Sequence, residues 1–501
     1  MTVDRPAATP EPATAEAPAE AAAPHAVAAA AAPAPADVDL ALISGPPYRT
    51  ILRLALPTVV AMLSQSVVNE IDVFFFSKLP HPEDSNAQAA LLPSLLIVWL
   101  FGGSLSAISV GTQALTARRY AERKYDSAGA VLANSAFFCL VAGILFAIIG
   151  AATIHDLLGV ILKVPEAHEI AYSYSRWRLL GIVSMAGTMA LKAFFDGVGK
   201  TWVHLVSAVV MNVFNILFCW MFIFGNLGAP RMGAPGAGFA AFVATWIGLG
   251  IMIFYAARER NRFSFLRWSN LSKSLTWDIL KLSIPAAMAT VVMMVGFGLF
   301  AQVAGKLDAA EALASPSGTR EAVNGAATTD IVAILKLTFT ACIAFGTATA
   351  TLVAQALAAK RPQDADRFGW ASVRLGLVLF GVIGLLEGVL FTPQIVHFIS
   401  HSEAVRQAAI GPMRMMGIVT PIIAVAMILS EALFGAGNTK FVAAAQFCLV
   451  FFLLVPMAWL LGIKLEVGLS GMWTAAVAYS IGAAIVMTLK FRGGSWKKIE
   501  L

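Results

Sequence analysis

The sequence predicts an all-α integral membrane protein with twelve transmembrane helices in two pseudo-symmetric six-helix bundles. Three observations support this prediction: the composition, the number of long apolar segments, and motifs that recur between the two halves of the chain. Of the 501 residues, 58% are hydrophobic and 13% are charged, whereas soluble proteins carry about 25% charged residues. The chain therefore lacks the charged surface of a soluble enzyme, and we expect it to lie in a lipid bilayer. Its formal net charge of +6 is expected to face anionic lipid, so no nucleic-acid partner is predicted.

The first 41 residues differ in composition from the rest of the chain. Residues 1–41 are mostly Ala and Pro, and the repeated prolines prevent a continuous helix. They lack a basic segment followed by an apolar core, which a signal peptide requires. We expect a disordered tail outside the fold.

Twelve segments of the remaining chain are apolar enough to cross a membrane. A spanning helix needs about 20 mostly apolar residues, because each residue rises about 1.5 Å and the hydrocarbon core is about 30 Å thick. The fourth segment differs from the others because it opens with two charged residues, Arg176 and Arg178. The sequence also predicts a longer external loop over residues 304–328. The predicted spans are 51–76, 88–113, 129–154, 171–193, 202–224, 236–257, 278–303, 329–357, 369–393, 411–434, 440–462 and 468–490.

Lys and Arg residues are distributed unevenly over the predicted connections. One side of the membrane, which includes both chain ends, receives more than twice as many of them as the other. Because cytoplasmic loops are enriched in Lys and Arg, we expect both termini in the cytoplasm and the protein in the cell inner (plasma) membrane.

Three short motifs occur once in each half, in the same order. Each predicted repeat holds six spans, so both enter the membrane from the same side. Parallel repeats of this kind are typical of transporters, with the substrate site between the repeats. We place the bundles at 42–270 and 271–495. The paired motifs are Leu54-Ala-Leu-Pro57 with Leu282-Ser-Ile-Pro285, Ala117-Arg-Arg-Tyr-Ala121 with Ala354-Gln-Ala-Leu-Ala358, and Gly197-Val-Gly-Lys-Thr201 with Gly435-Ala-Gly-Asn-Thr439.

These motifs also carry a family resemblance, which covers about residues 45–490. The chain resembles the multidrug and toxic compound extrusion (MATE) transporters. The resemblance implies two six-helix bundles, an alternating-access cleft, and export of organic cations driven by inward sodium or proton flow. Besides the Gly-x-Gly-x-Thr turns, the similar segments are Leu54-Ala-Leu-Pro57 with Asp72-Val-Phe-Phe-Phe-Ser-Lys-Leu79, Asn212-Val-Phe-Asn215 with Ile223-Phe-Gly225 and Pro230-Arg-Met-Gly233, and Thr349-Ala-Thr-Leu-Val-Ala-Gln355.

The first span carries a polar stripe that ends in a carboxylate. Thr58, Gln65, Asn69 and Asp72 share one face at helical spacing. An ionised Asp in a span costs about 3 kcal/mol, so such residues usually face a cavity or a partner. We expect this stripe to line the interior of the N-terminal bundle and to form an ion-coupling site. The alternative is that Asp72 lies near the external headgroups and is solvated.

Asn212 and Asn215 in the fifth span face the same way. Asn215 is assigned to the ion-coupling site and Asn212 to the substrate cleft, although a helix–helix hydrogen bond remains an alternative for Asn215. The family pairs this Asn with an Asp four residues later, where this chain has Cys219, and a Thr of its sixth span is Ala241 here. Both changes remove oxygen ligands. Sodium prefers several oxygen ligands, whereas a proton needs only one carboxylate. We therefore favour proton coupling and keep sodium as an alternative.

The remaining candidates line the predicted substrate cleft. Lys336 is the most deeply placed cation of the C-terminal half, while Glu387 and Glu431 are weaker candidates. Met185 and Met293 are included because methionine surfaces adapt to varied ligands.

The predicted function is a secondary active antiporter that exports amphipathic, cationic organic compounds. The alternatives are a flippase of lipid-linked saccharides, which needs a more basic cleft, and a channel or receptor. No catalytic constellation or metal site is evident, so we expect no enzyme activity and no cofactor apart from the coupling ion. We expect a monomer.

Overall fold

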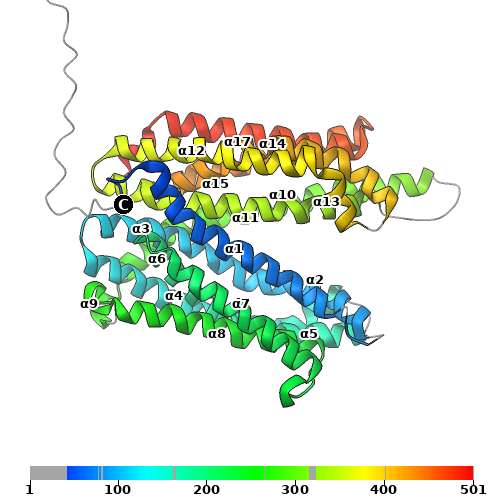
Figure 1. Ribbon diagram of the computed structural model, residues 1–501, viewed down its shortest axis with the longest axis horizontal. Helices are drawn as coiled ribbons and strands as arrows, with labels where there is room; N and C mark the ends of the chain where they lie inside the picture. The colour runs from blue at the N-terminus through cyan, green and yellow to red at the C-terminus, as the bar shows by residue number, and fades with distance from the viewer. Residues whose placement is uncertain are drawn as a thin grey trace, which may run out of the picture. The chain divides into compact units, whose positions relative to one another are not determined.

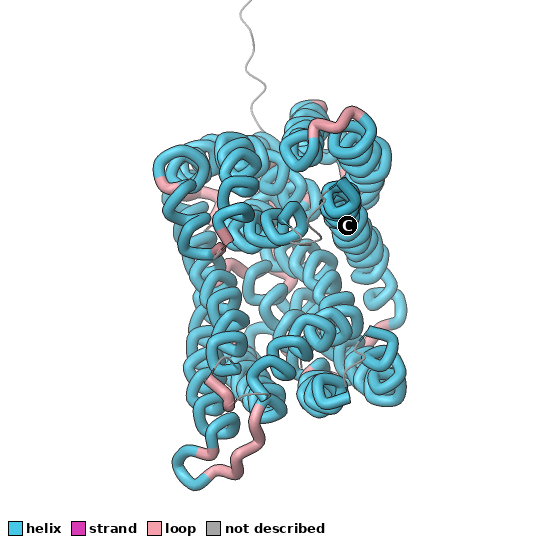
Figure 2. Tube along the Cα trace, turned by 90° about the vertical axis from the view of Figure 1, so that its right-hand side faces the viewer, coloured by secondary structure: helices cyan, strands magenta, loops and turns pink. Residues whose placement is uncertain are grey.

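The computed structural model describes residues 42–76, 78–80, 83–161, 165–265, 267–314, 323–400 and 402–499. The predicted tail, 1–41, lies outside the described residues. Every regular element in the described chain is helical, and Figure 2 shows no strand among them. The helical class of the prediction is confirmed.

The N-terminal half contains the first six predicted spans (Figure 1). The second predicted span is built from two helices joined by the short helix η1 (Gly103–Ala107), and the fourth is also divided in two. The helices are α1 (Pro47–Phe76), α2 (Glu83–Gly102), α3 (Ile108–Ala121), α4 (Tyr125–Ile161), α5 (Pro165–Leu180), α6 (Ile182–Gly197), α7 (Trp202–Phe224), α8 (Ala234–Arg258) and α9 (Arg260–Phe263).

The other six predicted spans lie in the C-terminal half, which runs from green to red in Figure 1. Two of its spans change to the wider π-helix along their length, at Leu386–Leu390 and in the segment after α15. The helices are α10 (Lys273–Ala314), α11 (Val323–Ala358), α12 (Pro362–Leu385), α13 (Thr392–Ile399), α14 (Glu403–Gly435), α15 (Thr439–Leu449), α16 (Val455–Trp459), α17 (Gly468–Arg492) and the short η7 (Ser495–Lys498).

Ten helical segments of the described chain are long and apolar enough to cross a membrane, and the bent pair α5–α6 is an eleventh. Helix α1, 30 residues long, occupies the first predicted span. The axes of α5 and α6 differ by 42°, and the break at Gly181 comes soon after Arg176 and Arg178, which lie in the last turns of α5. This break is the main departure from the predicted set of continuous spans.

The predicted external loop over residues 304–328 is wrong in extent. Helix α10 continues to Ala314 and α11 begins at Val323. The extension of α10 is rich in Ala, the strongest helix former. The carboxylate of Asp308 accepts hydrogen bonds from the amides of Asn324 (2.7 Å) and Gly325 (2.8 Å), which satisfies donors that a helix start leaves unpaired.

Side-chain contacts repeat between the halves at the spacing that the sequence motifs predict. Thr112 on α3 shares a 2.7 Å hydrogen bond with Ser135 on α4. Thr349 on α11 shares a 2.8 Å hydrogen bond with Ser372 on α12. Each residue of the second pair lies 237 positions after its counterpart, so α3–α4 and α11–α12 pack in the same way.

The two Gly-x-Gly-x-Thr turns also adopt the same conformation. Gly199 and Gly437 have φ angles of 78° and 85°, which favour glycine because it has no Cβ. In each turn the amides bond back to the end of the preceding helix: Lys200 N lies 2.8 Å from Phe195 O, and Asn438 N lies 2.9 Å from Leu433 O. The glycine motifs therefore end α6 and α14 identically.

The halves contact one another most closely at one end, which we call the basic end. It carries the turns after α3, α6, α11 and α14 and the C-terminal segment (Figure 1). Helix α1 joins the halves, because Ile51 and Leu54 near its start pack in the hydrophobic core of the C-terminal half while its later residues pack against α7. The predicted bundle boundaries remain a prediction.

Candidate ion-coupling site

The polar stripe of α1 ends inside the N-terminal half. The Asp72 residue is only 6% exposed. The Tyr174 hydroxyl on α5 donates a hydrogen bond of 3.1 Å to its Oδ2 atom, and the Cys219 thiol on α7 lies 3.7 Å from its Oδ1 atom. One carboxylate therefore links three helices, away from open solvent.

A cation accompanies this carboxylate. Arg178 on α5 interacts electrostatically with Asp72, and its guanidinium carbon lies 5.9 Å from the centre of the Tyr174 ring. Tyr174 and Arg178 are four residues apart, so they share one face of α5. A buried carboxylate with a nearby guanidinium carries little net charge, which lowers the electrostatic free energy of holding both in a membrane.

The predicted partners from the fifth span divide between two places. Asn215 lies one helical turn before Cys219, and its Oδ1 atom is 3.8 Å from the Cys219 sulfur. The Cys219 thiol therefore lies close to both Asn215 and Asp72. Asn212 donates a 3.0 Å hydrogen bond to Ser64 on α1, and its own Oδ1 atom is buried without a hydrogen-bond partner among the described residues.

The other two predicted residues of the ion-coupling site, Gln65 and Asn69, provide less information about it. Gln65 is half-buried on α1. The side chain of Asn69 lies outside the part of α1 whose side chains the structure describes.

The predicted cleft residues lie at separate places. Lys336 is exposed on α11. Met185 on α6 packs against Gly102 at the end of α2. Met293 on α10 is part of the C-terminal core, where the Tyr479 hydroxyl lies 3.0 Å from its sulfur.

Lys336 lies on a face of α11 that contacts the N-terminal half further along the helix. Thr347 and Thr351, further along α11, contact Gln113 of α3. Eleven residues are close to three helical turns, so Lys336 lies on nearly the same face as Thr347. The halves therefore touch at Thr347, while the same face of α11 is exposed at Lys336.

The two weaker candidates have partners of their own. Glu387 lies on the π-helix that follows α12, and both of its carboxylate oxygens are within 2.9 and 3.1 Å of the Thr338 hydroxyl. Glu431 on α14 packs against Gly346 of α11 and interacts electrostatically with Lys192 of the other half.

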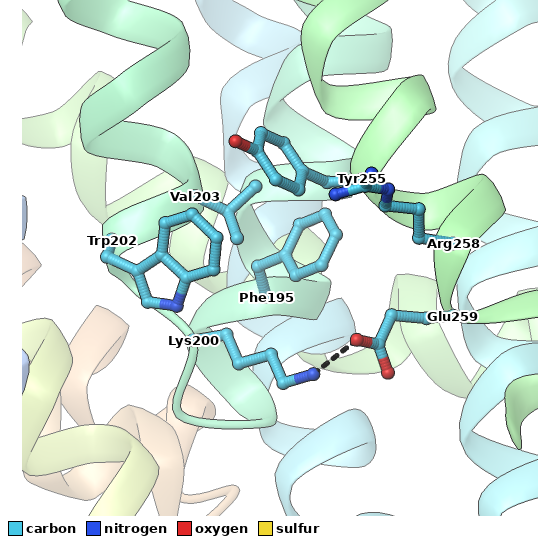
Figure 3. Close-up of a pocket in the computed structure, with 7 residues that line it drawn as sticks. All are labelled: Phe195, Lys200, Trp202, Val203, Tyr255, Arg258 and Glu259. Atoms are coloured by element: carbon cyan, nitrogen blue, oxygen red, sulfur yellow. Dashed lines mark hydrogen bonds and ion pairs between the residues drawn. The ribbon is translucent and has the colours of Figure 1, made fainter.

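A small cavity lies at the basic end, apart from Asp72. It has a volume of about 170 Å³. Figure 3 shows aromatic walls and an ion pair between Lys200 and Glu259 across its floor. Trp202 in this cavity and Cys219 are 17 residues apart on α7, about 26 Å along the helix. Its lining residues are Phe195, Lys200, Trp202, Val203, Tyr255, Arg258 and Glu259.

Sequence reasoning missed Tyr174 and Arg178 as site residues. It treated Arg178 as a residue at the edge of a span. The sequence did contain an indication of this pair. An arginine within an apolar segment needs a partner, and Asp72 was an acid in another span of the same half with no partner assigned to it. Cys219 was noted only as a missing oxygen ligand, although its thiol is in contact with the carboxylate.

The sequence model of the MatE family matches residues 57–221 and 320–460. These two segments fall in the two halves of the fold and together cover more than half of the chain. The chain belongs to the MatE family. The resemblance inferred from its motifs is thereby confirmed.

Relatives of this MatE protein carry multidrug-resistance names. The probable multidrug resistance protein NorM of Thermotoga maritima is 23% identical over 464 residues, which cover 90% of this chain and 93% of that protein. The multidrug resistance protein NorM of Aliivibrio fischeri is 23% identical over 333 residues, which cover 65% of this chain and 69% of that protein.

Solved structures of MATE transporters share the fold. An outward-facing multidrug resistance MATE family transporter of the MOP superfamily has a TM-score of 0.81 at 21% identity, covering 93% of this chain and 100% of that one. A MOP superfamily transporter from Pyrococcus furiosus, described as having a binding pocket of reversed polarity, also has a TM-score of 0.81 at 21% identity, covering 92% and 98%. The twelve-helix fold predicted from the sequence is that of these transporters.

Proposed function

We propose that this MatE protein is a secondary active antiporter that exports amphipathic, cationic organic compounds in exchange for protons. Its basic end then faces the cytoplasm, and substrate binds between the halves. Support for export comes from family membership and from the multidrug-resistance names of the relatives. Support for a role of Asp72 comes from its position, where one buried carboxylate holds α1 against α5 and α7.

The residues around Asp72 favour a proton over sodium as the coupling ion. A hard cation prefers several oxygen ligands, whereas one face of this site is a thiol and another is a guanidinium. The charge of Arg178 already compensates the carboxylate, so a second cation in the site is repelled. A proton instead adds to the carboxylate itself and needs no coordination shell.

Protonation acts on the contacts that hold α1. A neutral Asp72 loses its attraction to Arg178 and accepts a weaker hydrogen bond from Tyr174, since hydrogen bonds to charged groups are roughly twice as strong as neutral ones. Helix α1 is then less tightly held by α5, and its bend or position changes. Because α1 also packs in the C-terminal core, this change is transmitted to the other half and releases substrate.

The available driving force suffices for this exchange. One charge that moves through 100 mV supplies about 2.3 kcal/mol, and a tenfold proton gradient adds about 1.4 kcal/mol. Exchange of one proton for one neutral substrate draws on both contributions and supports a substrate gradient of roughly a few hundred-fold. Exchange of one proton for one singly charged cation moves no net charge, so only the proton gradient drives it, and a tenfold proton gradient supports a roughly tenfold substrate gradient.

Efflux of ethidium from proteoliposomes tests the proposal, with proton and sodium gradients imposed separately. We expect the proton gradient to drive efflux and Asp72→Asn to reduce proton-driven efflux at least about tenfold, because Asn cannot be protonated. Asp156→Asn is the matched control, since the Asp156 side chain is 92% exposed. Full proton-driven efflux by the Asp72→Asn protein would remove this residue from the mechanism. Efflux driven only by sodium would overturn proton coupling.

A further inference from the structure

The two halves exchange hydrogen bonds at the basic end in a reciprocal pattern. Arg118, at the end of α3, donates 2.9 Å to the carbonyl oxygen of Ala436, in the turn after α14. Gln355, at the end of α11, donates a 2.8 Å hydrogen bond to the carbonyl oxygen of Gly197, the last residue of α6. Each donor therefore belongs to one half and each acceptor to the other.

The two donors are related by the internal repeat, and the two acceptors lie in its equivalent turns, at the first residue of one motif and the second residue of the other. Gln355 lies 237 positions after Arg118, the same separation as between the equivalent threonine pairs of α3 and α11. The carbonyls of Gly197 and Ala436 belong to the two Gly-x-Gly-x-Thr turns. The packing of the first glycine of each turn also repeats. A Cβ on Gly197 would lie 3.0 Å from the carbonyl oxygen of Gln113, and a Cβ on Gly435 would lie 2.2 Å from that of Ala350. Gln113 and Ala350 are again 237 positions apart.

The acceptors are groups that a helix end leaves unpaired. The last four carbonyls of an α-helix have no intrahelical donor, and the C-terminus of a helix carries a partial negative charge that favours a cation such as Arg. Gln355 and Arg118 are 1% and 7% exposed, so water does not take their place while the halves are in contact. Other carbonyls at the ends of α6 and α14 are bonded within their own turns, but those of Gly197 and Ala436 receive these side-chain hydrogen bonds only while the halves are in contact.

Further polar residues on the same helices also link the two halves. Gln113 donates to Thr347 O (2.8 Å) and to the Thr351 hydroxyl (2.9 Å). The Thr351 hydroxyl in turn lies 3.0 Å from Asp196 O of the N-terminal half. Arg118 also donates 2.8 Å to Ile499 O, which ties the C-terminal segment to the same contact.

We propose that Arg118 and Gln355 are positioning residues of the transport cycle, which hold the basic end closed by capping the turn of the opposite half. We call these two residues, with the carbonyls of Ala436 and Gly197, the reciprocal latch. The proposal rests on the proposed alternating access, because only a transporter that opens at this end needs a contact that breaks there. Opening exposes both carbonyls and both donors to water at the same time, so the two bonds break together.

The test measures the distance between the halves at the basic end in lipid nanodiscs. Spin labels are attached at Lys124→Cys and Lys360→Cys, both exposed positions, in a Cys448→Ser background, because Cys448 is an exposed native cysteine. The readout is the ratio of long to short distances by double electron–electron resonance. We expect this ratio to rise about fivefold in Gln355→Ala, and about tenfold or more in Arg118→Ala, since bonds from charged donors are stronger. The double variant should show about the product.

Two controls separate the latch from general loss of packing. Thr112→Val removes the hydrogen bond within the N-terminal half, and Gln407→Ala removes an exposed Gln near Glu403. Neither should change the ratio, and Arg118→Lys should lie between the parent and Arg118→Ala. An unchanged ratio in the double variant, or an equal rise in Thr112→Val, overturns the proposal. The measurement uses no substrate or gradient, so a failure of ethidium efflux counts against the proposed function and not against the latch.

Discussion

At the residue scale, the central feature is a carboxylate that its neighbours make tolerable inside a membrane protein. An isolated ionised Asp in a span costs about 3 kcal/mol. Asp72 is compensated by the Tyr174 hydroxyl, the Cys219 thiol and the charge of Arg178. These partners come from two other helices, so the protonation state of Asp72 affects how three helices pack.

The identity of residue 219 should decide which ion the site accepts. Cys219→Asp adds two oxygens beside Asp72 and Asn215, and two carboxylates with one guanidinium leave a net charge of −1. Because hard cations prefer carboxylate oxygens, we expect sodium-driven ethidium efflux at least about tenfold above that of the parent. The measurement is efflux from proteoliposomes under a sodium gradient alone.

Cys219→Ser is the control for this prediction, since it changes the thiol without adding a charge. A folded Cys219→Asp protein that still responds only to protons would show that oxygen ligands at this position do not select the ion.

At the element scale, backbone features of single turns determine how helices end and how closely they pack. Gly199 and Gly437 allow the left-handed turn after α6 and α14. The first glycine of each motif has a different function. Gly197 lets α6 pack closely against α3, and Gly435 lets α14 pack closely against α11. Arg123 and Lys360, 237 positions apart, also share positive φ angles of 56° and 57°, so even the turns after α3 and α11 are equivalent.

Gly435→Ala should destabilise the protein. The added Cβ would lie 2.2 Å from the carbonyl oxygen of Ala350, so α11 and α14 must separate. Overpacking of this kind costs about 1–3 kcal/mol, which we expect as a lower temperature of thermal unfolding in detergent.

Gly298→Ala on α10 is the matched substitution, because a Cβ there meets nothing within 4 Å. It should leave the unfolding temperature unchanged or raise it, since Ala favours a helix by about 1 kcal/mol over Gly. Equal effects of the two substitutions would contradict the close contact at Gly435.

At the scale of the whole molecule, the repeat determines where the halves meet and where they separate. Gln113 and Arg118 bond to the C-terminal half at the basic end. Further along α11, the face that carries Thr347 becomes exposed at Lys336. This arrangement agrees with a substrate site between the halves on the side opposite the basic end.

Lys336→Cys, in the Cys448→Ser background, should react with a membrane-impermeant maleimide added to intact cells. We expect ethidium to slow the reaction severalfold, because Lys336 is exposed on nearly the same face of α11 that contacts the other half at Thr347. Labelling followed by gel-shift analysis measures the rate.

Ile148→Cys should stay unmodified under the same conditions. Ile148 on α4 is 62% exposed among other exposed apolar side chains, which indicates contact with acyl chains. No reaction at Lys336→Cys, or a rate that ethidium leaves unchanged, would place Lys336 outside the substrate path.

Local sequence determined the helices, their order and the repeat. In a membrane every backbone group must be hydrogen-bonded within its own helix, so apolar segments of sufficient length become helices largely independently of their neighbours. The same local logic explains the turns, where Gly199 and Gly437 are needed for a positive φ. The extent of α10 beyond the predicted loop, and the break at Gly181, were not predicted because apolar length alone does not determine where a helix ends or bends.

Only the tertiary structure decided which side chains meet. Asp72 and Tyr174 are 102 positions apart, and Arg118 and Ala436 are 318 positions apart. Hydrophobic periodicity determines which face of a helix turns inward, but the rotation and depth of each helix depend on packing against its neighbours. For that reason the sequence identified Asp72 as a candidate, whereas its partners Tyr174 and Arg178, and the exchange of caps between the halves, became visible only once the helices were packed together.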